Sequence, residues 1–167
     1  MSSVRPKSAR SGAAQPASRR DPASDTLAFM RLLWALDHRL RSISKQMQNR
    51  LGVTAPQRLA LRLVGRTPGL TPSELAGSLH LDRGTVTGIV ERLVSRGILQ
   101  RAPHPEDGRS VVLKLSARGR RLDRETTGTV EECVRRALSK LTPTQIEVAQ
   151  QVLEAIAHEL DVETQRE

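Results

Sequence analysis

Residues 70–119 read LTPSELAGSLHLDRGTVTGIVERLVSRGILQRAPHPEDGRSVVLKLSARG, and they contain the clearest structural pattern in the chain. Near the start, Thr71-Pro-Ser-Glu74 is a capping box with proline at the first helical position, which predicts a short helix to residue 79. After a tight turn, Asp82 is placed to cap a second helix, and Gly97 suits its C-terminal end. Two short helices joined in this way are typical of a helix-turn-helix motif.

A β-hairpin is predicted directly after these two helices, because the apolar period changes there from 3.6 residues to 2. Residues 98–101 read as a short strand and 110–115 as an alternating strand, with a loop of proline, glycine and acids at 103–109. The side chains expected on one face of the second strand are Val111, Leu113 and Leu115. A hairpin in this position is a wing.

Long helices are predicted on both sides of this stretch. Residues 25–50 have apolar side chains spaced by three and four, and a shorter helix begins at the cap Thr54. Ser116 caps a long helix reaching about residue 141, and Thr142-Pro-Thr-Gln145 begins the last one. The fold class is therefore mainly α, with a winged helix-turn-helix lobe at 54–115 inside a single domain of residues 25–162.

Composition limits the functions that this chain can perform. Its 167 residues are 1% aromatic, which argues against a single-strand binder that stacks bases on aromatic rings. The net charge is +9; residues 1–20 hold five basic side chains and no acid, whereas 121–167 hold ten acids and six bases. This asymmetry favours a face for a polyanion, although solubility alone also explains a high net charge.

Several kinds of site are not expected. Cys133 is the only cysteine, and the four histidines show no ligand spacing, so we predict no metal, no cofactor and no catalytic residues. No apolar run approaches the length of a membrane span and no signal-peptide region is visible, which predicts a soluble intracellular protein. Residues 1–24 are expected to form a disordered basic arm, although their composition also resembles a transit peptide.

The second short helix and the wing carry the candidate DNA contacts. Small residues on the outer face of the second short helix allow close approach to a duplex, and Arg83 on the same helix can reach a guanine or a phosphate. At the wing tip, Asp107 is expected to pair with Arg109 and extend it toward the minor groove. The alternatives without a DNA-binding role are that the helix face is merely solvated and that the wing tip is an ordinary surface turn. The predicted DNA-binding residues are Thr71, Ser73, Arg83, Gly84, Thr85, Thr87, Gly88, Arg92, Arg101, Asp107 and Arg109.

Residues 27–160 resemble the MarR family of winged-helix transcription regulators. The resemblance is carried by Leu81-Asp82-x-Gly-Thr-Val-Thr, by Arg96-Gly-x-Leu99 and by Asp107-Gly-Arg109-Ser. It implies a homodimer that reads a palindromic operator in double-stranded DNA. The resemblance further implies a cytoplasmic repressor of a bacterium or archaeon, associated with the nucleoid when bound to DNA, which a small aromatic or phenolic effector releases. The family's dimer lobe corresponds here to helices at 25–50 and 116–162. The residues expected at the dimer interface are Leu33, Leu36, Leu40, Ile146, Ala149, Leu153, Ile156 and Leu160.

Other readings remain open at this point. A ligand site is predicted at Trp34, Asp37, His38 and Arg41, although Trp34 also suits a core position. Cys133 reads as a structural thiol more readily than as an oxidant sensor. The alternatives for the whole chain are a winged-helix module that binds protein and a regulator without a ligand response. An enzyme is not expected, since no triad motif, glycine-rich phosphate loop or metal spacing is present.

Overall fold

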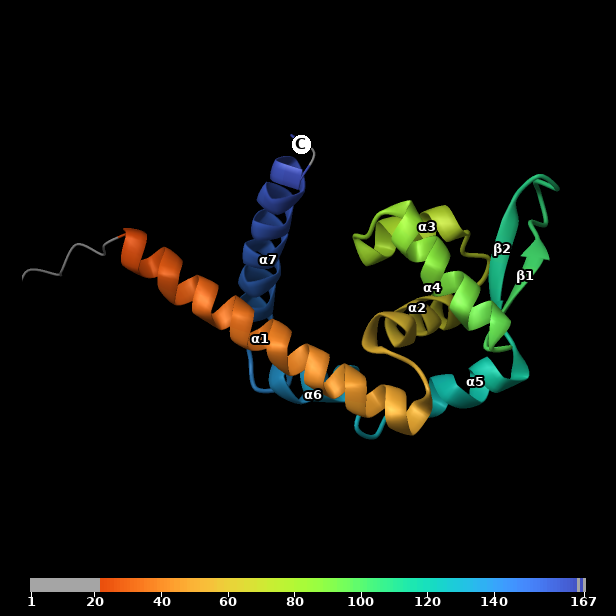
Figure 1. Cartoon of the computed structure of the whole chain (residues 1–167), viewed down its shortest axis with the longest axis horizontal. Coiled ribbons are helices and arrows are strands. Elements are labelled where there is room, and N and C mark those ends of the chain that lie inside the picture. The colour runs from red at the N-terminus through yellow and green to blue at the C-terminus, as the bar shows by residue number, and fades with distance from the viewer. Residues whose placement is uncertain (1–21, 165, 167) are drawn as a thin grey trace, which may run out of the picture. The chain divides into compact units, whose positions relative to one another are not determined.

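The computed structural model describes residues 22–164 and 166, which form helices and one two-stranded antiparallel sheet (Figure 1). The elements are α1 (Pro22–Leu51), α2 (Ala55–Arg66), α3 (Pro72–Leu79), α4 (Arg83–Ser95), β1 (Leu99–Pro103), β2 (Val111–Leu115), α5 (Ala117–Arg124), α6 (Val130–Leu138) and α7 (Pro143–Thr164). This order confirms the mainly helical class with a wing. Residues 1–21 of the predicted arm lie outside the described part, and α1 begins at Pro22, three residues before the expected start.

The chain divides into two units between Leu36 and Asp37, inside α1. In the first unit, the described residues 22–36 are helical, and several of their large apolar side chains, including Trp34, are exposed. The second unit contains the rest of α1 and the other described elements, and it holds the apolar core.

The core is built from α2, α3, α4 and the hairpin. Capping boxes begin α2 at Thr54 and α3 at Thr71, as their sequences predict. Because the chain is almost free of aromatic residues, the packed side chains are aliphatic. Members of the cluster with no exposed surface are Val53, Ala60, Leu61, Leu75, Leu93 and Leu113.

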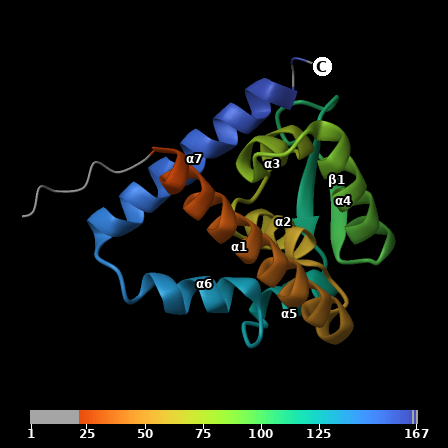
Figure 2. The same cartoon turned by 60° about the vertical axis from the view of Figure 1, so that its left-hand side comes forward.

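One residue in a left-handed conformation makes the turn between α3 and α4. His80 has φ 51° and ψ 45°, and the amide of Leu81 donates a hydrogen bond to the carbonyl of Ala76 at 3.2 Å. This bond closes the end of α3. Asp82 follows at once as the cap of α4. Figures 1 and 2 show α4 running beside the hairpin, with α3 packed against it.

The hairpin pairs Leu99 with Leu115 at its base and Pro103 with Val111 next to its loop. Val111, Leu113 and Leu115 share one face of β2, as predicted, yet Val111 is 38% exposed, whereas Val112, on the opposite face, is 1% exposed. Val111 is at the loop end of the strand, whereas Leu113 and Leu115, on the same face, belong to the core or pack against it. This face of the strand is therefore most exposed at its loop end.

The single helix predicted after the hairpin is two helices, α5 and α6. Gly128 has a φ of +61°, and the fully buried Thr129 caps α6 by accepting a hydrogen bond from the amide of Glu132 at 3.3 Å. The prediction of one continuous helix is therefore wrong. The guanidinium of Arg58 binds carbonyls at the break, so a long-range contact holds the interruption.

Gly119 lets α5 lie directly on the base of the hairpin. A Cβ at this position would meet the carbonyl oxygen of Ile98 at 2.2 Å, a separation that no side chain tolerates. Ser116 adds two hydrogen bonds, from its amide to the Ile98 carbonyl at 3.1 Å and from its hydroxyl to the Gly97 carbonyl at 2.6 Å. The close approach fixes the start of α5 relative to the wing.

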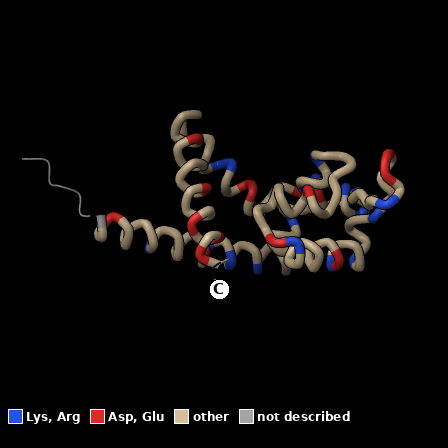
Figure 3. Tube along the Cα trace, turned by 90° about the horizontal axis from the view of Figure 1, so that it is seen from above, with Lys and Arg blue, Asp and Glu red and all other residues tan. Residues whose placement is uncertain are grey.

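The last helix, α7, begins with the predicted capping box between Thr142 and Gln145. Five of its residues are acidic and none is Lys or Arg, which gives it a uniform sign of charge (Figure 3). None of its residues is buried in the single chain. Among the described residues, no helix carries an apolar stretch long enough to cross a membrane.

Candidate nucleic-acid interface

Helix α4 buries one face and presents the other to solvent. Val86, Ile89, Val90 and Leu93 form the buried face. Space around Gly88 is open, since a Cβ there would have no neighbour within 4 Å. The predicted contact residues Arg83, Gly84, Thr85 and Thr87 are all exposed, and Gly88 is half-buried.

Asp82 organises the N-terminal end of this exposed face. Its Oδ1 accepts the amide of Thr85 at 2.8 Å, and its Oδ2 accepts the hydroxyl of Thr85 at 2.5 Å. These bonds hold the pKa of Asp82 below its usual value, and the bond from the Thr85 hydroxyl has the larger effect. The hydroxyl of Thr87 donates to the carbonyl of Arg83 at 2.7 Å, so both threonines present their methyl groups with fixed orientation.

The N-terminus of α3 is less open to a phosphate than its sequence suggests. The amide and hydroxyl of Thr71 both donate to Oε2 of Glu74 at 2.8 Å. These bonds hold the pKa of the Glu74 carboxyl below its usual value, and the bond from the Thr71 amide has the larger effect. A negative charge therefore already occupies this end of the helix. Ser73 is exposed beside it and keeps a free approach from solvent.

The acid at the wing tip holds the backbone of the turn. Oδ1 of Asp107 accepts the amide of Arg109 at 3.0 Å, and Oδ2 accepts the hydroxyl of Ser110 at 2.5 Å. The expected pairing of Asp107 with the Arg109 guanidinium is absent from the ion pairs of the described residues. The two hydrogen bonds that Asp107 accepts hold the pKa of its carboxyl below its usual value, and the bond from the Ser110 hydroxyl has the larger effect. Nδ1 of His104 accepts two further amides across the loop at 3.2 Å.

Four of the predicted DNA-binding arginines have no interaction partner for their guanidinium groups among the described residues. Within the part of the chain that the structure describes, their guanidinium groups make no hydrogen bond or ion pair, and all are exposed. They come from α4 and from the hairpin, which contact each other. These cations are Arg83, Arg92, Arg101 and Arg109.

Nothing in the local sequence pattern indicates a buried arginine on α2. Arg58 is 1% exposed, and its Nε donates to Oε1 of Glu131 at 2.7 Å. The other guanidinium nitrogens bind the carbonyls of Leu122 and Glu125, and that of Asp123 at 3.3 Å. Arginine at a helix position normally reads as a solvated side chain, so only its long-range partners reveal this role.

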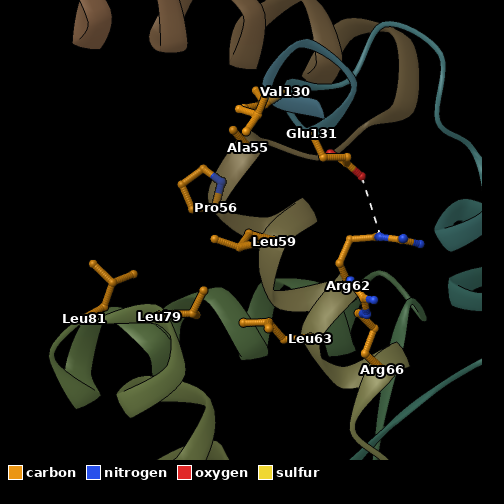
Figure 4. Close-up of a pocket in the computed structure, with 11 residues that line it drawn as sticks. Ala55, Pro56, Leu59, Arg62, Leu63, Arg66, Leu79, Leu81, Val130 and Glu131 are labelled. Carbon is orange, nitrogen blue, oxygen red and sulfur yellow. Dashed lines mark ion pairs between the residues drawn. The ribbon is translucent and has the colours of Figure 1, made fainter. Parts of the chain in front are cut away.

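A cavity of about 550 Å³ lies between α2, the turn after α3, and α6 (Figure 4). Aliphatic side chains supply most of its wall, among them Leu59, Leu63 and Val130. Two arginines line it as well: Arg62, which pairs with acids, and Arg66, which has no partner among the described residues. Such a space suits a small molecule with an apolar body and one polar or charged group.

The ligand site predicted on the first helix does not coincide with this cavity. Asp37 and Arg41 pair with each other at 2.8 Å, and His38 is exposed between them. Trp34, which belongs to the first unit, is 66% exposed. None of the four residues lines the cavity.

The residues predicted for a dimer interface leave much apolar surface uncovered. On α7, Leu153 is 50% exposed and Leu160 is 63% exposed. Ala149 is exposed, and Ile146 and Ile156 are half-buried. On α1, Leu33 is half-buried, whereas Leu36 and Leu40 are exposed at 48% and 37%.

A helix-turn-helix followed directly by an arginine-tipped hairpin is a winged helix, a class that includes many DNA-binding proteins. Residues 53–111, which run from the segment before α2 to the start of β2, match the MarR family. A helix-turn-helix transcriptional repressor of Mycobacterium tuberculosis is 30% identical over 106 residues, which cover 64% of this chain and 76% of the repressor. The chain therefore belongs to the MarR family.

Other relatives agree in fold and differ in coverage. The organic hydroperoxide resistance transcriptional regulator of Bacillus subtilis is 34% identical over 88 residues, 53% of this chain, and the chain spans only 60% of that regulator. A MarR mutant of Escherichia coli solved in complex with operator DNA is 26% identical, with a TM-score of 0.62, over 81% of this chain and 98% of that one. The PcaV regulator of Streptomyces coelicolor, solved with its natural ligand, is 25% identical, with a TM-score of 0.61, over 84% of this chain and 97% of that one.

Proposed function

We propose that this protein is a transcriptional repressor that binds a palindromic operator in double-stranded DNA as a homodimer. One observation carries the proposal: α4 and the wing present exposed arginines that have no partner within the described residues. An uncommitted guanidinium loses few internal contacts on binding and gains charge-assisted bonds to phosphate or guanine. The relative solved with operator DNA supports the same use of this surface.

Helix α4 enters the major groove, and the wing reaches the adjacent minor groove. Arg83 is at the first turn of α4, where recognition helices contact base edges. Arg109 projects from a turn that Asp107 holds rigid, so little entropy is lost when the guanidinium enters a narrow groove. Arg92 and Arg101 bind phosphates, which adds affinity without sequence preference.

The homodimer forms through α7 and α1 of two copies. Helix α7 is 22 residues long with no buried residue, and isolated helices are marginally stable in water. Its apolar positions, from Ile146 to Leu160, are spaced by three and four along one face. A second copy of this chain supplies a matching face, and a two-fold axis presents two α4 helices to half-sites about 34–36 Å apart.

A small aromatic or phenolic molecule that enters the cavity between α2 and α6 releases the repressor. The volume of about 550 Å³ is in the range of small-molecule sites, and Arg66 offers a free cation. The relative crystallised with its natural ligand supports a ligand response in this family. The four residues predicted from the sequence, Trp34, Asp37, His38 and Arg41, stay a separate prediction for the effector site.

Selection of bound fragments from genomic DNA, followed by fluorescence anisotropy on the selected duplex, tests this function. We expect tight binding that weakens steeply from about 50 to 200 mM salt, because phosphate contacts release counterions. Scrambled DNA of equal length is the control. Equal affinity for the two duplexes, or an affinity that does not change with salt concentration, contradicts the proposal. Either result favours a winged-helix module that binds protein.

A further inference from the structure

The joint between α5 and α6 is held by charged groups on α2. We propose that Glu131, clamped by Arg58 and Arg62, is a positioning residue that sets the orientation of α6 and α7 against the winged helix. It thereby fixes the spacing of half-sites that the dimer accepts. This inference rests on the proposed function, because half-site spacing has meaning only for a dimer on DNA.

The joint is a local interruption that needs external support. Residues 125–129 are not helical, and Gly128 takes a left-handed φ of +61°. Helix α5 ends here, so its last carbonyls have no partner within the helix. The Leu122 carbonyl accepts the amide of Glu125 at 3.2 Å, and the guanidinium of Arg58 adds bonds to the carbonyls of Leu122 and Glu125 from the interior of the fold. The end of α5 is thus fastened to α2.

The same arginine also fastens the start of α6. Nε of Arg58 donates to Oε1 of Glu131 at 2.7 Å, and Nε of Arg62 lies 3.8 Å from the same oxygen (Figure 4). Arg62 in turn donates to the carbonyl of Asp123 at 2.8 Å and to its Oδ1 at 2.9 Å. One carboxylate on α6 therefore faces two guanidinium groups of α2, and both of these also bind the end of α5.

Apolar packing does little to replace these bonds. Between α2 and α6 the aliphatic side chains, such as Leu59 and Val134, line the cavity of about 550 Å³ instead of closing on each other. Groups that are not in close contact lose most of their dispersion attraction. The pairs of Glu131 are therefore a principal restraint on how α6 lies against α2. Beside them, Arg50 binds the carbonyl of Thr127 within the joint.

The orientation of α6 passes directly to α7, because only residues 139–142 separate the two helices. In a dimer built on α7, the separation of the two α4 helices then depends on the angle at the α5–α6 joint. A rigid joint accepts one half-site spacing and rejects others, whereas a loose joint accepts several at similar affinity. One inserted base pair moves a half-site by about 3.4 Å and turns it by about 35°.

The test compares operators that carry zero, one or two base pairs inserted between the half-sites. We expect the wild-type dimer to lose affinity by about tenfold or more with one insertion, the size of an ordinary coupling between sites. Glu131→Gln removes the charge at nearly constant volume, and we expect it to reduce that penalty to about threefold or less, while the dimer and the binding of a single half-site are kept. Glu125→Gln is the matched control, because its exposed side chain has no partner among the described residues.

Hydrogen exchange at residues 125–131 gives a second readout, which needs no DNA. We expect faster exchange there in Glu131→Gln than in Glu125→Gln. If Glu131→Gln does not fold, Arg62→Gln at a half-exposed position makes the same comparison. An unchanged spacing penalty in the variant that folds overturns the inference and leaves the repressor intact. Failure of the wild type to bind any selected duplex overturns the proposed function itself.

Discussion

The backbone amide of Arg109 donates a hydrogen bond to Oδ1 of Asp107 at 3.0 Å, while the Arg109 guanidinium has no partner among the described residues. The acid therefore shapes the main chain of the wing tip and leaves the cation free. Ser110 completes the turn through its hydroxyl bond to Oδ2. A rigid turn with a free guanidinium is an arrangement suited to probing a groove.

Replacement of Arg109 with alanine tests the wing. We expect weaker operator binding and loss of a preference for A·T pairs beside each half-site, because a narrow minor groove attracts arginine through its concentrated negative potential. The melting temperature should not change, since the guanidinium makes no hydrogen bond or ion pair with any of the residues that the structure describes. Anisotropy with A·T-flanked and G·C-flanked duplexes measures the preference. Unchanged affinity for both removes the wing from the interface.

Replacement of Arg83 with alanine tests direct readout by α4. If Arg83 binds a guanine through two hydrogen bonds, the substitution costs about 1–3 kcal/mol and relaxes specificity at one base pair of each half-site. Competition among single-base variants of the operator measures this. A loss of equal size for every sequence assigns Arg83 to a phosphate instead.

The cap of α4 predicts a pH dependence of stability. The pKa of Asp82 is lowered in the folded state by its bonds to Thr85, so the ionised cap stabilises the fold above the usual aspartate pKa. That contribution is lost as the pH falls through the lowered value. Asp82→Ala should melt at a lower temperature than the wild type at neutral pH, and the gap should shrink below about pH 4. A gap of constant size down to about pH 2 contradicts this role.

Two glycine substitutions should act in opposite directions. Gly119→Ala places a Cβ 2.2 Å from the Ile98 carbonyl, and overpacking of this kind costs about 1–3 kcal/mol of unfolding free energy. Gly77→Ala is the control inside α3, where no atom lies within 4 Å and the helix gains about 0.5–1 kcal/mol. Urea denaturation measures both. Equal effects at the two positions argue against the close approach of α5 to the hairpin.

A charge on α7 should break the dimer. Leu153 is 50% exposed in the single chain and is one of the residues predicted for the dimer interface, so Leu153→Glu should yield a folded monomer with weak operator binding. Val148→Glu, at a 52% exposed position outside the predicted interface residues, should remain dimeric. Light scattering after size exclusion gives the mass of each species. Dimers in both variants place the interface elsewhere.

Short-range patterns predicted much of the fold. Capping boxes at Thr54, Thr71 and Thr142 mark the starts of three helices, and Asp82 and Ser116 mark two more, because a cap uses only residues within one turn. The change of period after Gly97 likewise identifies the wing. The exposed face of α4 follows from its helical spacing alone.

Patterns fail where a distant residue decides the outcome. The break between α5 and α6 looks like a weak point at Gly128 in an otherwise continuous helix. It becomes a joint because Arg58, more than sixty residues away, binds its carbonyls. The pairing expected between Asp107 and Arg109 fails for a different reason. Two donors of the turn, the Arg109 amide and the Ser110 hydroxyl, occupy both carboxylate oxygens.

By itself, the sequence determined the winged helix-turn-helix and the exposed face of α4, since local caps and periodicity encode these features, and its motifs resembled those of the MarR family. Only the tertiary structure decided that Arg58 is buried, that Glu131 joins it, and that a cavity lies between α2 and α6. The physical reason is that a buried charge is stable only beside partners that satisfy it, and those partners are brought together only by folding.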